Sequence, residues 1–361
     1  MFKFAELKTI HIEISNNCQA SCPMCPRNIH GGLPNNNIKI QNWTLSEFKK
    51  IFSKSVLNTI DGFYFCGNYG DPLLNADLLE MVDYASNIND KLNIRIHTNG
   101  SLRSHQWWTD LANVMPDTGL VVFALDGLED THSLYRIGTN FNTVIENAKS
   151  YIATGKAAEW AFIKFKHNEH QVDEIRKLAK ELGFTRLSIK NSSRWVATDK
   201  FNVVDKEGKT IYYLEPAESN HLQLVTPEIL KNYKSIVANS IIDCQAIQKK
   251  EIYIDAYKNV YPCCWIAQIP HDYTYNDISK DVRTDIKRQY YELVERLGGL
   301  EKLNAANNSL EDIIMSYEYQ TVYKDYWQNR GLITCARQCG KTDLNFAKSK
   351  DQWIENKEID A

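Results

Sequence analysis

Three cysteines near the start of the chain have a spacing that suits a metal centre. Cys18, Cys22 and Cys25 lie four and three residues apart, directly after the strand-like run at residues 9–14. A proline follows each of the last two cysteines, so the segment is predicted to be a loop rather than a helix interior. A [4Fe-4S] cube usually takes four cysteines. Three thiolates would therefore leave one iron open to a substrate or cofactor, as a catalytic zinc site keeps one open position.

Two simpler interpretations of this trio stay open. In the first, the cysteines are inert residues of the core. In the second, they form half of a zinc site that is completed elsewhere in the chain. Zinc-binding pairs more often have two residues between their cysteines, whereas the first pair here has three.

The pattern Cys-x3-Cys-x2-Cys in a loop after a first strand resembles the cluster motif of the radical S-adenosylmethionine (SAM) enzymes. The resemblance implies that the open iron binds the amino and carboxylate groups of SAM. One electron would then cleave SAM into methionine and a 5′-deoxyadenosyl radical, which abstracts a hydrogen atom from the substrate. The family usually has an aromatic residue before the third cysteine. Here that position is Met24, whose polarizable side chain suits the same packing role.

Length and composition are typical of a globular chain. The 361 residues, of which 43% are hydrophobic and 24% charged, predict one large domain and a smaller one. A net charge of −3 gives no general attraction to nucleic acid or to an anionic membrane. The sequence shows no membrane-spanning stretch and no apolar signal core. Nine clustered cysteines do not fit a secreted disulfide scaffold, so a reducing cytoplasm is the expected location.

Strand-like and helical segments alternate between about residues 9 and 190. The predicted strands lie at residues 9–14, 62–66, 92–98, 120–125, 160–166 and 186–190. Strands that alternate with helices imply parallel βα units with right-handed crossovers. Six such units predict an α/β fold, a partial, TIM-like (β/α)6 barrel, which is also the fold that the resemblance implies. Chemistry in such barrels gathers at the carboxyl ends of the strands.

A glycine-rich turn at residues 67–74 follows the second predicted strand. It resembles the family's Gly-Gly-Glu-Pro motif, whose backbone and acid hold the SAM ammonium group. The resemblance therefore assigns Gly70, Asp71 and Pro72 to the SAM site. Asp71 stands where the family has Glu, so its carboxylate reaches one methylene less far. The alternative is a βα turn in which Asp71 caps a helix.

The third predicted strand ends in a turn that resembles the family's Thr-Asn-Gly segment and assigns Asn99 to the SAM site. Period-two alternation places His97 and Asn99 on one face of this strand, opposite Ile96 and Thr98. If Ile96 faces the helices, His97 points into the barrel toward substrate or SAM. A purely structural histidine is the alternative.

The fourth predicted strand runs into Asp126-Gly127, and Arg136 follows ten residues after the aspartate. This resembles the family's Ser-x-Asp-Gly segment and the arginine that pairs with the SAM carboxylate. The fork of guanidinium donors suits that role. Ala124 replaces the family's serine, which removes one polar contact. A turn residue without a role in binding is the alternative for Asp126.

Alternation in the fifth and sixth predicted strands separates lysines from apolar residues. One face is predicted to carry Lys164, Lys166, Ser188 and Lys190, and the other Ile163, Phe165, Leu187 and Ile189. With the apolar face under the helices, the lysines would line the barrel mouth. Lys164 and Lys190 are therefore predicted to meet a carboxylate or phosphate of SAM or substrate. Lysines that simply snorkel at the rim are the alternative.

A second group of cysteines comes from three separate segments. It comprises Cys244, the adjacent pair Cys263 and Cys264, and Cys335 with Cys339. Four thiolates from these segments can converge on a buried four-cysteine cluster, with zinc as the alternative metal. A predicted hairpin at residues 251–262 and a largely helical insert connect them.

This segment resembles the single-cluster "twitch" form of the SPASM extension found on many radical SAM enzymes. The resemblance implies an auxiliary [4Fe-4S] cluster beside the active site, held by Cys244, Cys263, Cys335 and Cys339. Cys263 is preferred to Cys264 only because adjacent side chains of an extended segment point opposite ways. The last pair has three intervening residues where the family usually has two. Two alternatives therefore stay open: the two cysteines do not both bind this cluster, or one of its irons is open to substrate. Cys66 is predicted to be a buried filler.

The predicted organisation has four parts. A radical SAM partial barrel occupies residues 1–194, a bridge 195–243, a small α+β twitch/SPASM-like domain 244–345 and a polar tail 346–361. We expect an oxidoreductase- or maturase-type enzyme that modifies a peptide or protein side chain or a small polar metabolite. Its electron donor would be a flavodoxin or ferredoxin. A non-catalytic, cysteine-rich zinc- or Fe–S-binding scaffold is the alternative, and neither the substrate nor the oligomeric state follows from the sequence.

Overall fold

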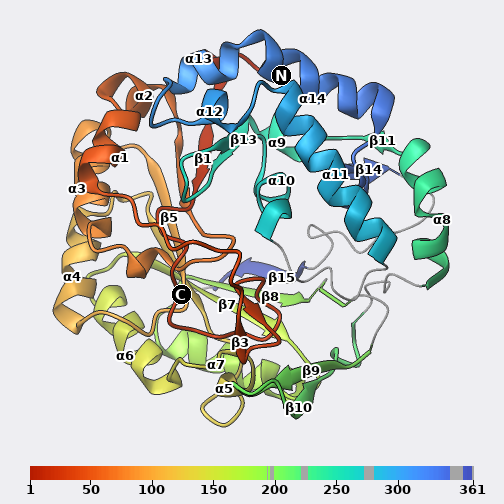
Figure 1. The fold of residues 1–361 in the computed structure, drawn as a ribbon. Helices are drawn as coiled ribbons and strands as arrows, with labels where there is room; N and C mark the ends of the chain where they lie inside the picture. Colours follow the sequence, from red (N-terminus) through yellow and green to blue (C-terminus); the bar gives the residue numbers. More distant parts are fainter. Residues whose placement is uncertain (193, 196–198, 221–226, 272–279, 342–352, 360–361) are drawn as a thin grey trace.

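A nine-stranded sheet organises the computed structural model, which describes residues 1–192, 194–195, 199–220, 227–271, 280–341 and 353–359 (Figure 1). The strand order is β13-β12-β1-β4-β5-β6-β7-β8-β15. Every neighbouring pair from β12 to β8 is parallel. The strands are β1 Thr9–Ile12, β4 Gly62–Phe65, β5 Asn93–Thr98, β6 Leu120–Ala124, β7 Ala157–Lys164, β8 Arg186–Asn191, β12 Glu251–Ile254, β13 Val260–Tyr261 and β15 Trp353–Glu358.

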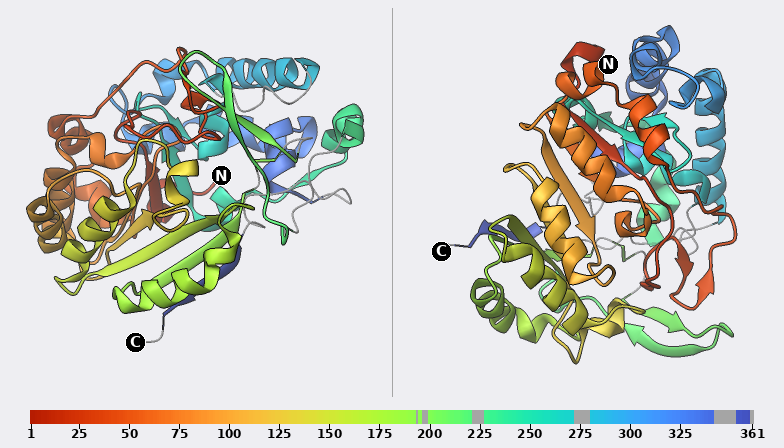
Figure 2. Two further views of the ribbon diagram at one scale, coloured as in Figure 1. Left: turned by 90° about the horizontal axis from the view of Figure 1, so that it is seen from below. Right: turned by 90° about the vertical axis from the view of Figure 1, so that its left-hand side faces the viewer.

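The six strands predicted from the sequence are all present, and helices cover the outer face of the sheet, as Figures 1 and 2 show. On β5, Ile94 and Ile96 are fully buried in the core beneath these helices. The fold class predicted from the alternation of strands and helices is confirmed. The helices of this part are α1 Leu45–Ile51, α2 Lys54–Thr59, α3 Leu78–Ile88, α4 His105–Val114, α5 His132–Tyr135, α6 Phe141–Ile152 and α7 Val172–Glu181, with short 3-10 turns at Phe4–Glu6, Pro72–Leu74 and Glu169–Gln171.

Two strands extend the predicted barrel at its edges. The hairpin predicted at residues 251–262 forms as β12 and β13, and β12 also pairs in parallel with β1. At the opposite edge, β15 pairs antiparallel with β8. β15 lies in the segment predicted to be a polar tail, whose residues 346–352 and 360–361 lie outside the described residues. Both edges of the predicted six-stranded core are thus covered by later parts of the chain.

The bridge predicted at residues 195–243 is more regular than its sequence indicated. It contains a hairpin formed by β9 Phe201–Val204 and β10 Thr210–Leu214, then α8 Pro227–Ala238 and β11 Ile241–Ile242. The hairpin lies against the cysteine loop, because the Val204 N–H donates to the His30 carbonyl at 3.0 Å. A small pair, β2 Asn28–Ile29 with β3 Leu33–Pro34, extends that loop.

The last part of the chain is largely helical, as the sequence predicted, and occupies the top and the upper right of Figure 1. Its elements are α9 Gln245–Lys249, α10 Cys264–Ala267, a 3-10 turn Ile269–His271, α11 Lys280–Arg296, α12 Leu300–Leu303, α13 Leu310–Met315, α14 Tyr317–Asp325, a π-helical turn Tyr326–Arg330, α15 Ile333–Cys339 and β14 Gly340–Lys341. Buried tyrosines fill this core; the hydroxyls of Tyr261 and Tyr290 lie 3.0 Å apart.

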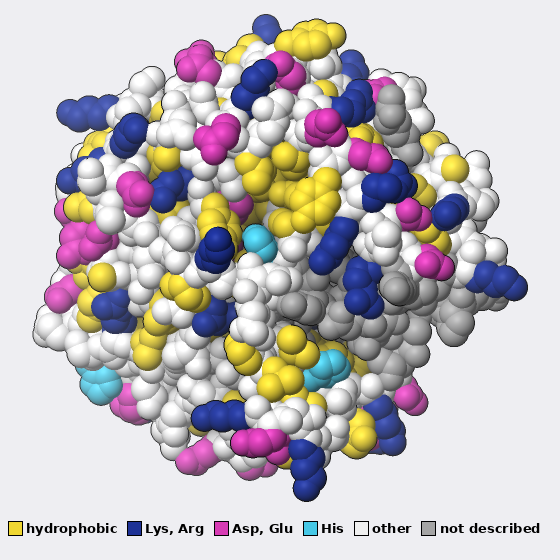
Figure 3. Space-filling view, in the orientation of Figure 1, with side chains coloured by type: hydrophobic (Ala, Val, Ile, Leu, Met, Phe, Trp, Pro, Cys, Tyr) yellow, Lys and Arg dark blue, Asp and Glu magenta, His cyan; other side chains and the backbone are white. Residues whose placement is uncertain are grey.

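Surface features agree with the balanced composition. On the face shown in Figure 3, basic and acidic side chains are interspersed. In the described part of the chain, no helix combines the length and the apolar character that a bilayer crossing requires.

Candidate active site

The loop that carries Cys18, Cys22 and Cys25 follows β1 at the carboxyl end of the barrel strands. All three are free thiols, of which Cys22 is buried and the other two partly exposed. They lie close enough for the Cys18 thiol to interact electrostatically with both others. Burial raises the pKa of the Cys22 thiol to about 11. Because a metal binds the thiolate, a bound cluster would have to offset this cost of burial.

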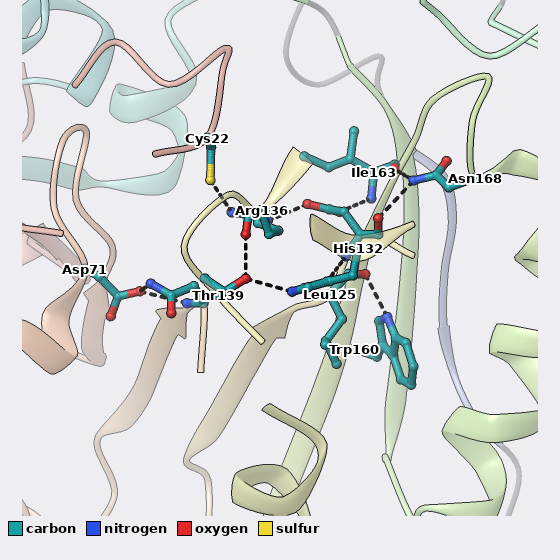
Figure 4. A network of polar contacts seen from close by, with 11 residues as sticks. Cys22, Asp71, Leu125, His132, Arg136, Thr139, Trp160, Ile163 and Asn168 are labelled. Carbon is teal, nitrogen blue, oxygen red and sulfur yellow. Dashed lines mark hydrogen bonds and ion pairs between the residues drawn. The ribbon is translucent and has the colours of Figure 1, made fainter. Parts of the chain in front are cut away.

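Two N–H donors point at the sulfurs of this loop. The Asn99 side-chain amide lies 3.7 Å from the Cys18 Sγ. The Arg136 Nη1 lies 3.8 Å from the Cys22 Sγ, a contact drawn in Figure 4. Hydrogen bonds to cysteine sulfurs are one of the ways in which proteins tune iron–sulfur clusters. Three thiols from one loop with two sulfur-directed donors are therefore a donor set that fits such a cluster.

A site for a single metal ion requires a different arrangement of side chains from a site for a [4Fe-4S] cube. Within the described ranges, no group of three or more His, Cys, Asp and Glu side chains is arranged to hold a metal ion. In a cube, by contrast, each cysteine binds a different iron, so the sulfurs need not surround one point.

Met24, the residue predicted to pack near SAM, lies between the cysteines and the barrel wall. Its side chain is 1% exposed and belongs to a small cluster with Cys22, Tyr135 and Phe165. Its carbonyl accepts a hydrogen bond of 2.6 Å from Arg194. The loop is thus anchored to the wall at the position just before the third cysteine.

Asp71 ties the second and third strand ends together. Its buried carboxylate accepts hydrogen bonds from the Thr98 hydroxyl at 2.8 Å and from the Asn99 N–H and Nδ2, both at 2.7 Å. It also caps the 3-10 turn that begins at Pro72, through the Leu73 N–H at 3.0 Å. Burial raises the pKa of this carboxyl despite these donors. Asp71 thus has the capping role that the sequence analysis gave as the alternative. Any contact of its carboxylate with SAM would be additional to this role.

Asp126 and Arg136 meet beside Cys22. The fully buried Asp126 carboxylate accepts from the Arg136 Nε at 2.5 Å and from the Ile163 N–H at 2.6 Å (Figure 4). One edge of the guanidinium is thereby fixed, and another nitrogen is directed at the Cys22 sulfur. The two residues that the resemblance assigned to SAM binding thus come together, with Asp126 orienting Arg136.

His132 is part of this network and was missed by the sequence analysis. Its Nδ1 accepts from the Asp126 N–H at 3.3 Å, and its Nε2 lies 2.8 Å from the Thr139 hydroxyl, which donates to the Arg136 carbonyl at 2.7 Å. Burial, with a smaller contribution from Arg136, lowers the pKa of His132 to about 3, so the ring is neutral. The sequence signal that could have identified His132 is its position four residues before Arg136, a spacing that places two side chains on the same face of a helix.

His97 faces the barrel interior, as strand alternation predicted. Its Nδ1 lies 3.5 Å from the Tyr64 hydroxyl, and the two rings are 4.5 Å apart. Tyr64 in turn contacts the ring of His11, whose Nε2 is 2.6 Å from the Cys66 carbonyl. Burial lowers the pKa of His97 to about 3 and that of His11 to about 4. The interior thus carries a layer of neutral histidine and tyrosine rings, of which only His97 was predicted.

The predicted orientation of Lys164 was wrong. The register pairs Ile163 with Lys190, so these two side chains share a face of the sheet. Ile163 packs against the small apolar cluster that contains Cys22 and Met24. Lys164 points the other way and donates to the Ser219 hydroxyl at 2.6 Å, while Lys166 pairs with Glu215 on the outside. The apolar residues Ile163 and Phe165 pack against the cysteine loop, not against the helices. Because the prediction placed them under the helices, it assigned the residues of β7 to the wrong faces. On β8 the predicted face of Lys190 was correct; its contact with SAM or substrate stays a prediction.

This difference gives a matched pair of variants. Lys190 is partly buried among Asp126, Arg136 and Arg194, and burial lowers its pKa. Replacing Lys190 with Ala is expected to weaken SAM binding at least about tenfold, because a charge-assisted contact is worth roughly 1.5–3 kcal/mol. Lys164→Ala should change the Kd less than twofold. Equilibrium dialysis of the reconstituted protein, with iron content as a control, measures both. Equal effects of the two variants would contradict the assigned orientations.

The second cysteine group converges as well. Cys263 is the N-cap of α10 and interacts electrostatically with Cys244 and Cys339, and Cys335 interacts with all three. Cys335 and Cys339 lie on the single helix α15, where a separation of four residues places both on one face. The helix accounts for the three intervening residues that the sequence analysis noted as a departure from the family.

The adjacent Cys264 has different neighbours. After Cys263, the charged groups that act on its thiol are Glu251 and Cys66. Cys66 lies next to the interior layer, where burial raises its pKa to about 11. Cys264 and Cys66, the two thiols outside the predicted ligand sets, thus lie near each other, and of the four predicted ligands only the adjacent Cys263 is among the groups found to act on Cys264.

No family model and no curated protein matches the sequence, but solved structures share its fold. Streptococcus suis SuiB bound to the precursor peptide SuiA has 14% identity and a TM-score of 0.54, over 91% of this chain and 71% of SuiB. The anSMEcpe structure with bound AdoMet, which is SAM, has 16% identity and a TM-score of 0.51, over 96% and 92%. In SuiB bound to S-adenosylmethionine, at 15% identity and a TM-score of 0.47, the match spans 72% of this chain and only 61% of SuiB. The fold implied by the resemblance to the radical SAM enzymes is thus confirmed, since the chain has the fold of SuiB and anSMEcpe.

Proposed function

We propose that this chain is a radical SAM enzyme, which cleaves S-adenosylmethionine reductively and abstracts a hydrogen atom from its substrate. The observation that carries the proposal is the cysteine trio at the barrel mouth, with Asn99 and Arg136 directed at two of its sulfurs. The fold is consistent with it, because anSMEcpe is a protein of this fold whose structure holds AdoMet.

In this proposal Cys18, Cys22 and Cys25 hold a [4Fe-4S] cluster by three corners. When bound, the cluster would supply the electron that splits SAM into methionine and the 5′-deoxyadenosyl radical. The remaining task of the protein is to orient SAM and to exclude water from a reactive site. The buried, apolar surroundings of Cys22 and Met24 serve the second purpose.

Orientation of SAM is assigned to the strand ends. The turn with Gly70, Asp71 and Pro72 and the neighbouring Asn99 would receive the amino group of SAM. Arg136 would bind its carboxylate, held in place by Asp126 and the neutral His132 network. A guanidinium whose direction is fixed in advance loses little freedom on binding, which favours affinity.

A second [4Fe-4S] cluster is assigned to Cys244, Cys263, Cys335 and Cys339. Its role would be to accept an electron from the substrate radical, giving a net two-electron oxidation, or to bind substrate directly. We assign a peptide or protein side chain as the substrate, because SuiB was solved with a precursor peptide and anSMEcpe with the Cp18Cys peptide. A flavodoxin or ferredoxin would deliver the electrons.

Anaerobic reconstitution with iron and sulfide tests the proposal. We expect about eight irons per chain for two cubes, broad visible absorbance, and 5′-deoxyadenosine formed from SAM with dithionite. The competing function, a zinc-binding scaffold without turnover, predicts stoichiometric zinc and intact SAM. Metal analysis and chromatography of the nucleoside products separate the two, and intact SAM in a fully iron-loaded protein would refute the enzymatic proposal.

A further inference from the structure

A buried carboxylate directly after β1 has three protein donors. Glu13 is 2% exposed, and its Oε1 accepts from the N–H of Tyr69 at 2.7 Å and of Gly70 at 2.9 Å. Its Oε2 accepts from the Tyr253 hydroxyl on β12 at 2.9 Å. A carboxylate is costly to bury and is tolerated where such donors satisfy it. Burial nonetheless raises the pKa of Glu13 to about 7.

The turn at residues 67–70 is shaped around this carboxylate. A Cβ on Gly67 would lie 2.5 Å from the Glu13 Oε1, so the carboxylate occupies the space of a side chain there. A Cβ on Gly70 would collide with the Ser15 carbonyl oxygen, which shows how closely the turn approaches the cysteine loop. Glycine is needed at both positions because a side chain would meet the Glu13 carboxylate at Gly67 and the Ser15 backbone at Gly70.

The planar peptide geometry determines where the carbonyl groups of this turn point. In a trans peptide the carbonyl points opposite to the N–H. With the N–H groups of Tyr69 and Gly70 held by Glu13, the carbonyls of Asn68 and Tyr69 are turned away from it. Carbonyl oxygens are the acceptors that an amino group needs. Glu13 therefore fixes the acceptor side of this turn on the face opposite to itself, where we place the amino group of SAM.

The same turn is hydrogen-bonded to α10, the short helix that begins at Cys264. The Asn68 side-chain amide donates to the Cys264 carbonyl at 2.9 Å, and the Tyr69 hydroxyl donates to the Gln268 carbonyl at 2.6 Å. Both acceptors belong to α10 or directly follow it, and Cys263 is the N-cap of α10. Glu13 and this turn thus connect β1, the proposed SAM site and the auxiliary cysteine site.

We propose that Glu13 is a positioning residue that fixes the 67–70 turn for the amino group of SAM and, through that turn, fixes α10 beside it. The inference rests on the proposed function, because it names the turn as the SAM amino-group site. Glu13 does not touch SAM; it acts through the backbone of Tyr69 and Gly70. Position rather than charge is what it contributes, since a neutral acceptor of the same length satisfies the same donors.

Variants of Glu13 in the full-length, reconstituted protein test the inference. Glu13→Gln keeps the side-chain length: its oxygen can accept from both N–H groups and its amide can donate to the Tyr253 hydroxyl. We expect its SAM Kd to stay within about threefold of the unmodified protein. Glu13→Asp keeps the charge but withdraws the carboxylate by one carbon, and Glu13→Ala removes it. Both should raise the SAM Kd at least about tenfold, with iron content unchanged.

Glu47→Ala is the matched control, because Glu47 also accepts protein donors and pairs with Lys258, yet belongs to the start of α1. It should leave the SAM Kd unchanged. If Glu13→Ala fails to fold, the Asp and Gln variants still decide. Tight SAM binding by Glu13→Asp, or equal loss in Asp and Gln, would overturn the positioning role. Absence of SAM binding in the unmodified, iron-loaded protein would instead overturn the proposed function.

Discussion

Replacing Cys22 with Ala is expected to reduce 5′-deoxyadenosine formation to background and to remove about four of about eight irons per chain. Cys22 is the most buried thiol of its loop, at 7% exposure, and its sulfur accepts a hydrogen bond from Arg136. Without this sulfur the cube would be held by two cysteines of one loop. Water would then reach the open corners, and the site for SAM would be lost with the cluster.

Iron and acid-labile sulfide assays, with chromatographic detection of 5′-deoxyadenosine, measure the effect. Cys66→Ala is the control, because Cys66 is also a poorly accessible thiol but lies after β4 and outside both proposed ligand sets. It should retain about eight irons. A Cys22→Ala protein with full iron content and continued SAM cleavage would show that the trio does not hold the reactive cluster.

The barrel strands could be predicted because each carries its own burial pattern. Ile94 and Ile96 alternate with polar positions on β5, and both are fully buried on the helix side. The alternation of apolar and polar residues gave the wrong face where apolar side chains pack against the cysteine loop and not against the helices. Ile163 and Phe165 are apolar because they cover the cysteine loop, so their pattern alone indicates the wrong face. Only the pairing with β8 reveals it.

Contacts between distant segments could not be predicted from local pattern. Tyr253 meets Glu13 across 240 positions of sequence, and β12 pairs with β1 although the chain between them forms the whole barrel. Neither segment carries a signal for its partner, because backbone pairing is nearly independent of side-chain identity. Glu13 itself was visible as an acid between two isoleucines, but its function depends on a turn that follows 54 residues later. The candidate site residues found from motifs each lie in a short segment after one strand, so they could be recognised before their partners from other strands were known.

The largest expected effect outside the SAM site concerns the adjacent cysteines of α10. Cys263→Ala is expected to lose about four irons and Cys264→Ala none, although the two changes are chemically identical. Cys263 interacts with Cys244, Cys335 and Cys339, whereas Cys264 lies near Glu251 and Cys66. Adjacent side chains at a helix N-terminus diverge, so both cannot serve one cluster.

Metal analysis should be combined with electron paramagnetic resonance of the dithionite-reduced proteins. Cys263→Ala should keep the signal that responds to SAM and lose the second one, while Cys264→Ala should keep both. The reversed pattern would make Cys264 the ligand and require α10 to turn about its axis. That rotation would also break the hydrogen bond from Asn68 to the Cys264 carbonyl. Because this bond joins α10 to the turn held by Glu13, the ligand assignment and the positioning role of Glu13 depend on the same orientation of α10.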